Sequence, residues 1–151
     1  MKKELIVLVG IPCSGKSTWS QRHGDNSKIL SRDNLREKYF GKLYKPTSSG
    51  ENYITELFDE EVEKALRNVR FDKIILDNTH CKEKYIDTII KIFGKQCDVK
   101  IVFFEISLFK AHFRNILRYI KTGKWIPFKV INKKKKNYNK LNKSKYQNLL
   151  N

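Results

Sequence analysis

Short apolar runs bounded by polar residues and turn formers recur along the chain, and they predict the strands of a buried sheet. The first run, Leu5–Val9, is apolar throughout and ends at Gly10. Strands covered on both faces of a parallel sheet have this continuous pattern rather than an alternating one. The same pattern predicts strands at Lys73–Leu76 and Val99–Phe104, and Lys28–Leu30 is a weaker candidate.

Between these runs, apolar residues recur at the three- and four-residue spacing of amphipathic helices. The clearest case extends from about Glu51 to Val69. The stretch before it, Tyr44–Gly50, contains Pro46 and three small residues, which predicts an exposed loop. Residues that cap or stop helices mark the limits of the remaining predicted helices. One ends at about Arg22, and the others span residues 33–40, 82–93, 108–121 and the stretch after Pro127.

Strands that alternate with helices predict parallel βαβ units with right-handed crossovers. We therefore expect an α/β fold with a parallel sheet of four strands, or of five, flanked by helices. At 151 residues the chain has room for one domain, which we expect at 1–131. The Lys- and Asn-rich residues 132–151 would form a C-terminal helix or tail of that domain. Their Lys133–Lys136 run is typical of a solvated face or a frayed end.

Charge and localisation add two expectations. The chain has 32 Lys and Arg against 16 Asp and Glu, a formal net charge of +16. A basic surface attracts polyanions such as nucleic acids, although an A/T-rich genome would supply many of the same lysines. The apolar start, Leu5–Val9, is shorter than the roughly 7–15 residues of a secretory signal, and we expect a cytoplasmic, intracellular protein. Cys13, Cys81 and Cys97 have no spacing typical of a metal site.

The segment Gly10–Thr18, GIPCSGKST, matches the phosphate-loop motif G-x-x-x-x-G-K-[ST] between a predicted strand and a predicted helix. Gly10 and Gly15 permit backbone angles and a close approach that a side chain would block. Backbone N–H groups then converge on phosphate oxygens at the positive end of a helix. Lys16 would contact the β- and γ-phosphates, and the Ser17 hydroxyl can bind Mg²⁺. The segment predicts a P-loop fold that binds ATP or another nucleoside triphosphate through Gly10, Ser14, Gly15, Lys16, Ser17 and Thr18.

A triphosphate site can serve a switch, a motor or a kinase. The chain is short for a motor and lacks the Asn-Lys-x-Asp and D-x-x-G motifs of a guanine-nucleotide switch, which favours a small kinase. A kinase needs a carboxylate that orients or deprotonates the attacking hydroxyl. Asp33 and Asp77 each follow a predicted strand, and the carboxyl ends of parallel strands face one crevice. The alternatives are helix capping beside Ser31 for Asp33 and a turn or cap role for Asp77.

A pair of arginines lies four residues apart on one face of a later predicted helix. Arg114 and Arg118 precede Gly123, and a mobile arginine that closes over a triphosphate stabilises charge on the transferred group. We therefore expect a helical lid at about 114–127, with these arginines near the donor phosphates. The alternative is a basic face exposed to solvent.

Four segments, in this order, resemble the kinase domain of phage-type 5′-polynucleotide kinases. They are GIPCSGKSTW at 10–19, SRDNLR at 31–36, LDNT at 76–79 and the arginine pair before Pro127. The resemblance covers nearly the whole chain, and its SRDNLR segment is more discriminating than the phosphate loop. The chain has no D-x-D-x-[TV] motif, which marks the 3′-phosphatase domain of the bifunctional enzymes of that family.

The resemblance implies a role for each residue on the acceptor side. Asp33 would be the general base for the 5′-hydroxyl. Arg36 would contact the substrate phosphate next to that hydroxyl, and Asp77 would hold Arg36 in place. Arg32, in the same segment, would belong to the acceptor-binding residues.

The resemblance implies a polynucleotide 5′-hydroxyl kinase that uses ATP and Mg²⁺ and whose partners are the 5′ ends of DNA or RNA, with no membrane. Arg118 would be the lid arginine on the donor phosphates, with Arg114 in support. One alternative is a small-molecule kinase on the same fold. Another is a nucleic-acid-binding protein whose triphosphate site only regulates it. The sequence makes no prediction of the oligomeric state.

Overall fold

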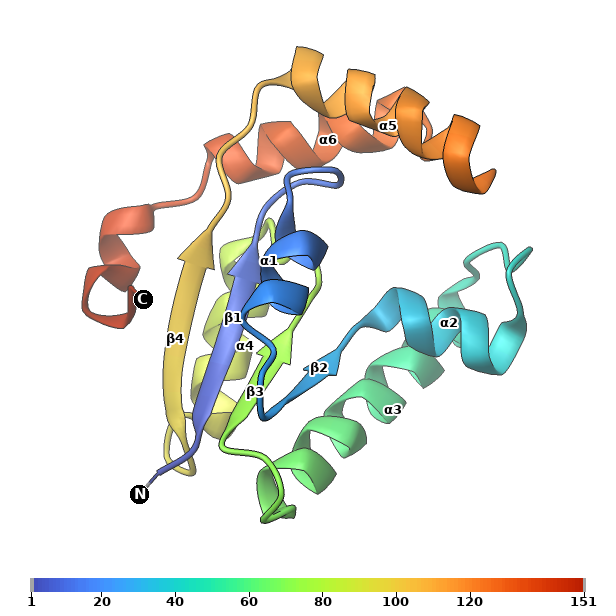
Figure 1. Ribbon diagram of the computed structural model, residues 1–151. Helices are drawn as coiled ribbons and strands as arrows, with labels where there is room; N and C mark the ends of the chain where they lie inside the picture. The colour runs from blue at the N-terminus through green and yellow to red at the C-terminus, as the bar shows by residue number, and fades with distance from the viewer. Residues whose placement is uncertain (1, 151) are drawn as a thin grey trace.

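Four apolar segments form the parallel sheet of the computed structural model, which describes residues 2–150. The strands pair in the order β2-β3-β1-β4 (Figure 1), and they are β1 Glu4–Val9, β2 Ser27–Leu30, β3 Lys73–Leu76 and β4 Asp98–Phe103. β1 is buried from Leu5 to Val9, because it has a strand on each side and helices on each face. The predicted parallel sheet is confirmed, including its weaker candidate strand.

The register of the sheet brings the ends of three strands to one edge. β1 pairs with β3 from Glu4 to Val7 and with β4 from Glu4 to Val9. β2 pairs with β3 as far as Leu30 and Leu76. The loops after β1, β2 and β3 therefore open at the same edge. Beyond β4, Leu150 makes a single parallel bridge with Ile101, at the place of a fifth strand.

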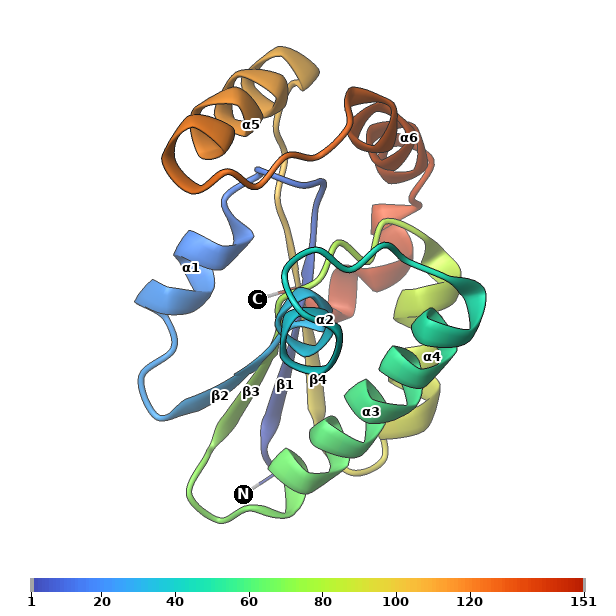
Figure 2. The ribbon, with the colours of Figure 1, turned by 90° about the vertical axis from the view of Figure 1, so that its right-hand side faces the viewer.

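Helices cover both faces of the sheet (Figure 2). In chain order they are α1 Lys16–Arg22, α2 Arg32–Phe40, α3 Ser48–Arg67, α4 Glu83–Phe93, α5 Leu108–Thr122 and α6 Phe128–Asn139, followed by the 3₁₀ helix η1 Lys143–Leu149. On the side of α1, Trp19 packs on Ile6 and Leu8 of β1. The opposite face, under α3 and α4, holds the larger cluster, which includes Ile54 and Ile86. None of the helices in the described part of the chain is long and apolar enough to cross a membrane.

Two helices begin earlier than their sequence patterns predict, because side chains cap them. The Thr47 hydroxyl accepts a hydrogen bond from the Gly50 N–H at 3.2 Å, so α3 begins at Ser48. The predicted loop through Gly50 is therefore wrong over its last residues. Ser31 caps α2 in the same way, and that helix begins at Arg32.

The C-terminal segment is helical over most of its length and contributes to the core. Ile131, Tyr138 and Tyr146 are buried in the main cluster. The Tyr146 hydroxyl donates a hydrogen bond to Asp87 Oδ1 of α4 at 2.8 Å. The frayed-end alternative for the Lys133–Lys136 run is therefore wrong, because α6 includes the run.

The lysine run on α6 is only partly a solvated face. Lys133 and Lys136 are exposed, as predicted. Lys134 and Lys135 are half-buried, and Lys135 Nζ lies 2.9 Å from Glu105 Oε1 and 2.8 Å from the Ile106 carbonyl oxygen. The two inner lysines thus fasten α6 to the end of β4 and to the neighbouring loops.

Truncation of Ile131 tests the contribution of α6 to the core. We expect Ile131→Ala to lower the free energy of unfolding by roughly 2–5 kcal/mol, the usual range for a large aliphatic side chain removed from a packed site. Lys133→Ala, two residues away and exposed, should change it by less than about 0.5 kcal/mol. Denaturant titration measures both, and equal effects would contradict the packing described for α6.

Candidate active site

The phosphate loop joins the end of β1 to the start of α1, and its two glycines have different tasks. A Cβ atom on Gly10 would lie 2.7 Å from Ser14 Oγ and 2.9 Å from Phe104 Cβ, so the close approach of the chain excludes a side chain. Gly15 has a φ of 100°, in the left-handed region, and directly precedes α1. The loop therefore turns sharply into α1, and the N–H groups at such a helix N-terminus are suited to an anion.

Lys16 is buried, and its ammonium group lies over the loop. Its Nζ donates to the Ile11 carbonyl oxygen at 2.8 Å and to Ser14 Oγ at 3.3 Å. Burial lowers the pKa of Lys16, and the nearby Asp77 carboxylate opposes this effect. A cation in this position, beside a ring of N–H groups, is suited to the oxygens of a triphosphate.

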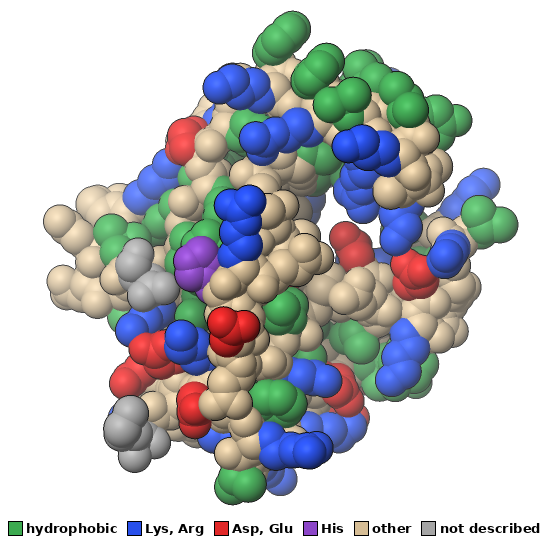
Figure 3. All heavy atoms as spheres, viewed as in Figure 1, with side chains coloured by type: hydrophobic (Ala, Val, Ile, Leu, Met, Phe, Trp, Pro, Cys, Tyr) green, Lys and Arg blue, Asp and Glu red, His purple; other side chains and the backbone are tan. Residues whose placement is uncertain are grey.

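A cavity of about 750 Å³ extends from the phosphate loop to the ends of β2 and β3. Its size suits a nucleotide-sized ligand. The cavity brings together most of the predicted site residues, which are Ser14, Gly15, Lys16, Ser17, Thr18, Asp33, Asp77, Arg114 and Arg118. Figure 3 shows a hollow between the upper helices and the right-hand part of the molecule, with Lys and Arg side chains on its upper rim.

Helix α5, the predicted lid, contacts the phosphate loop. Arg114 Nη1 donates to the Cys13 carbonyl oxygen at 3.2 Å, and Arg118 lines the cavity one turn further on. Past the end of α5, Lys124 Nζ lies 3.0 Å from Glu37 Oε2 of α2. The segment from Arg114 to Lys124 thus contacts both the phosphate loop and α2.

Asp33 lies in the first turn of α2, at the mouth of the cavity. Ser31, not Asp33, caps this helix, because the Ser31 hydroxyl accepts the bond from the Asn34 N–H. The Asp33 side chain is 81% exposed, and Arg36 Nη1 lies 2.6 Å from its Oδ1. The carboxylate is therefore free on its remaining side for a hydroxyl group.

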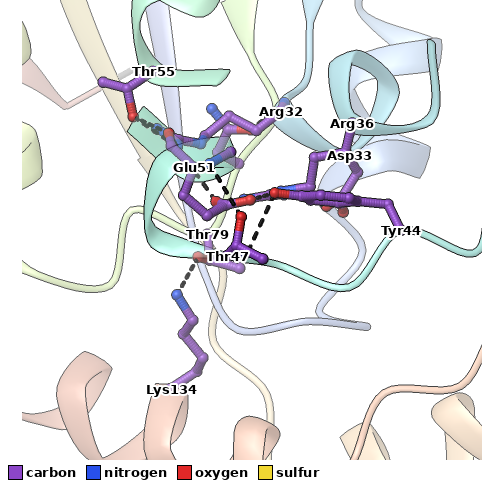
Figure 4. Close-up of polar contacts among 11 residues, drawn as sticks. Arg32, Asp33, Arg36, Tyr44, Thr47, Glu51, Thr55, Thr79 and Lys134 are labelled. Atoms are coloured by element: carbon purple, nitrogen blue, oxygen red, sulfur yellow. Dashed lines mark hydrogen bonds and ion pairs between the residues drawn. The ribbon is translucent and has the colours of Figure 1, made fainter. Parts of the chain in front are cut away.

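Arg36 is held by Glu51, and the predicted support from Asp77 is wrong. Arg36 Nε and Nη2 donate to Glu51 Oε1 and Oε2 at 2.9 and 2.6 Å, a bidentate pair (Figure 4). These bonds lower the pKa of Glu51 and raise that of Arg36. Sequence reasoning missed Glu51; its only signal was an acidic residue in the first turn of a helix.

Arg32 connects α2 to its neighbours. Its Nη2 donates to Thr55 Oγ1 at 2.8 Å, and its backbone N–H donates to Asn78 Oδ1 at 2.8 Å. Its side chain is thus directed toward α3, and the residue does not line the cavity. Its predicted part in substrate binding remains a prediction.

Asp77 directly follows β3 and lines the cavity. Its Oδ2 accepts a hydrogen bond from Ser20 Oγ at 3.4 Å, and it lies near enough to Lys16 to favour the charged ammonium. The Ser17 hydroxyl lines the same cavity. One hydroxyl and one carboxylate beside a phosphate loop fit Mg²⁺, which takes few protein ligands and completes its shell with phosphate oxygens and water.

His80, three residues after Asp77, is buried in a strained conformation. His80 has a φ of 43°, and its Nδ1 lies 2.9 Å from the Leu8 carbonyl oxygen of β1. Burial lowers the pKa of His80 to about 4. The ring is therefore neutral at pH 7 and donates from Nδ1 to the strand that leads into the phosphate loop.

The stability of the protein should depend on the protonation of His80. The unfolded chain takes up this proton near pH 6.5 and the folded one near pH 4, so unfolding is favoured as the pH falls through this range. His80→Asn keeps an N–H donor and tolerates a positive φ. Between pH 6.5 and 4, the wild type should lose up to about 3 kcal/mol of unfolding free energy relative to this variant. Parallel curves for the two proteins would contradict the assignment.

Three solved structures with the same architecture show what this chain is similar to. A chain of the Pnkp1/Rnl/Hen1 RNA repair complex is 28% identical, with a TM-score of 0.79 over 91% of this chain and 44% of that chain. This chain thus spans less than half of that relative. The deoxyadenosine kinase from M. mycoides with bound dATP is 18% identical, with a TM-score of 0.58 over 97% and 88% of the two chains. A gluconokinase from Sinorhizobium meliloti 1021 is 16% identical, with a TM-score of 0.56 over 89% and 74%.

The two small-molecule kinases support the fold alone, because their identities are low. A search of curated protein sequences found no match. The sequence model of the AAA domain family matches residues 5–141, which include β2, β3, β4, all of β1 after Glu4, and every residue that lines the cavity. This chain, with its phosphate loop and its four-stranded parallel sheet, therefore belongs to the AAA domain family and has a P-loop kinase fold.

Proposed function

We propose that this protein is a 5′-hydroxyl polynucleotide kinase that transfers the γ-phosphate of ATP to the 5′ end of DNA or RNA. One observation carries the proposal. A single cavity contains the phosphate loop and the Asp33 carboxylate, and Arg36 fixes that carboxylate from one side. A donor site and a candidate base for a hydroxyl acceptor therefore share one space.

The chemistry that follows is an in-line transfer. Asp33 accepts the proton of the 5′-hydroxyl as its oxygen forms a bond to the γ-phosphorus. The bond between that phosphorus and the β–γ bridging oxygen breaks, and ADP leaves. Lys16 and the lid arginines Arg114 and Arg118 neutralise charge on the phosphate oxygens. Mg²⁺ bound between Ser17, Asp77 and the phosphates would supply further neutralisation of this charge.

Two further facts favour a nucleic acid as the acceptor over a small molecule. The net charge of +16 raises the local concentration of polyanions. The most similar of the three relatives described above belongs to an RNA repair complex, whereas the small-molecule kinases share less than a fifth of their residues with this chain. A nucleic-acid-binding protein with a regulatory triphosphate site would not need a carboxylate in the position of Asp33.

Replacement of the proposed base tests this function. With labelled γ-phosphate of ATP and 5′-hydroxyl DNA and RNA oligonucleotides, we expect wild-type transfer and a loss of about 10²-fold or more in turnover for Asp33→Ala. The affinity for ATP should change little, because the donor contacts lie on the phosphate loop. Asp25→Ala, at an exposed position in the α1–β2 loop, is the matched control. Equal turnover of Asp33→Ala and wild type would refute the role of Asp33.

Glu51 should act through Arg36. We expect Glu51→Gln to lower kcat for the oligonucleotide about tenfold, because the weakened charge-assisted pair, worth roughly 1.5–3 kcal/mol, leaves Arg36 less able to fix Asp33, and to leave the KM for ATP unchanged. Glu56→Gln, an exposed position on the same helix, should match the wild type. A rise in the KM for ATP alone would instead place the Arg36–Glu51 pair on the donor side.

A further inference from the structure

Asn78, Thr79 and Lys134 carry hydrogen-bond donors on or against the segment that follows β3. Lys134 Nζ donates to Thr79 Oγ1 at 3.1 Å, so the hydroxyl proton of Thr79 remains available to another acceptor. The Asn78 side chain accepts the Arg32 N–H through Oδ1. Its Nδ2 is buried, and no residue in the described part of the chain accepts a hydrogen bond from it. The Lys134 ammonium, the Thr79 hydroxyl and the Asn78 amide therefore each have an N–H or O–H group available to a further acceptor.

Lys134 also lacks the counter-ion that its neighbours have. Within residues 2–150, no carboxylate oxygen lies within 4.0 Å of its Nζ, whereas Lys135 and Lys143 both pair with Glu105. The sequence contains no Asp or Glu after Glu105, so the C-terminal segment cannot supply one. A half-buried ammonium with a neutral partner loses part of its hydration, and an incoming anion would offset that loss.

The arginine expected to bind the acceptor phosphate is, by contrast, already engaged. Arg36 directs Nε and Nη2 to Glu51 and Nη1 to Asp33. A phosphate at Arg36 would have to approach two carboxylates that repel it. Among the described residues, no carboxylate pairs with Lys134 Nζ.

The position of these donors matches the path of an acceptor. Asn78 and Thr79 line the cavity that contains Asp33 and the phosphate loop. Figure 4 shows Lys134 extending from α6 toward Thr79, with Glu51 and Arg36 on the other side of that residue. α6 thus faces the acceptor residues across the loop that follows β3.

We propose that Asn78, Thr79 and Lys134 form a subsite for a backbone phosphate of the acceptor strand. The inference rests on the proposed function and makes it more specific. It assigns to the C-terminal helix a direct contact with the polynucleotide, through residues that the sequence analysis did not place in the site. Lys134 supplies the charge, and the neutral donors fix the position of the phosphate oxygens.

Neutral acceptors and a charge-removing variant test the subsite together. In the phosphate-transfer assay, Lys134→Met should raise the KM for a 5′-hydroxyl oligonucleotide about tenfold and leave the KM for ATP unchanged. A set of oligonucleotides, each with one internucleotide phosphate replaced by an uncharged methylphosphonate, should contain one that the wild type uses about tenfold less well. On that oligonucleotide, Lys134→Met should cause little further loss, because the two changes remove the same interaction. Lys133→Met, with the same change of charge at an exposed position, is the control.

Each result separates the two claims. If the wild type is active and Lys134→Met behaves like Lys133→Met, the subsite is wrong and the proposed function stands. The subsite is also wrong if, for every methylphosphonate position, the fold-loss in use of the oligonucleotide multiplies with the fold-loss caused by Lys134→Met. If the wild type phosphorylates no oligonucleotide while it still binds ATP, the proposed function is wrong, and the subsite falls with it.

Discussion

The hydrogen bonds of the four residues after β3, Asp77–His80, hold the candidate site together. The Asp77 N–H donates to the Leu30 carbonyl of β2, and the Thr79 carbonyl accepts from Gly10, where the phosphate loop begins. His80 bonds to β1 at Leu8. Side chains of the same segment meet α1, α2 and α6. One short segment thus positions the phosphate loop, α2 and α6.

This arrangement explains why a strained histidine is buried next to the site. His80 adopts a left-handed conformation at the end of this segment. Such a conformation costs of order 1–3 kcal/mol in a residue other than glycine. The bond from its ring to Leu8 and its burial hold it there. The segment can therefore keep Asp77 and Thr79 fixed while the exposed side chain of Asp33 meets a substrate.

Electrostatics divides the cavity into two sides. One side carries Lys16, Arg114 and Arg118, with Asp77 as the nearby carboxylate. On the other side, Asp33 pairs with Arg36, which in turn pairs with Glu51 outside the cavity lining. Such an arrangement suits a reaction in which negative charge accumulates on one substrate and a proton leaves the other.

The sequence predicted the parts of this site that depend on local pattern. The phosphate loop, the sheet and the two aspartates after β2 and β3 follow from motif, apolar runs and strand direction. The pairing of Arg36 with Glu51 was missed, because the two residues are joined by a loop whose path no local pattern specifies. Lys134 was assigned to a solvated run for the same reason: its contact with Thr79 spans 55 residues of sequence.

The most direct test of the account is the choice of acceptor by the wild-type enzyme. The ratio kcat/KM should be measured with ATP for a 5′-hydroxyl oligonucleotide and for deoxyadenosine and gluconate, the acceptors that the names of the two distant relatives suggest. The account predicts a preference of about 10²-fold or more for the oligonucleotide, since only that acceptor presents both a hydroxyl and a backbone phosphate. Equal or better use of either small molecule would contradict it.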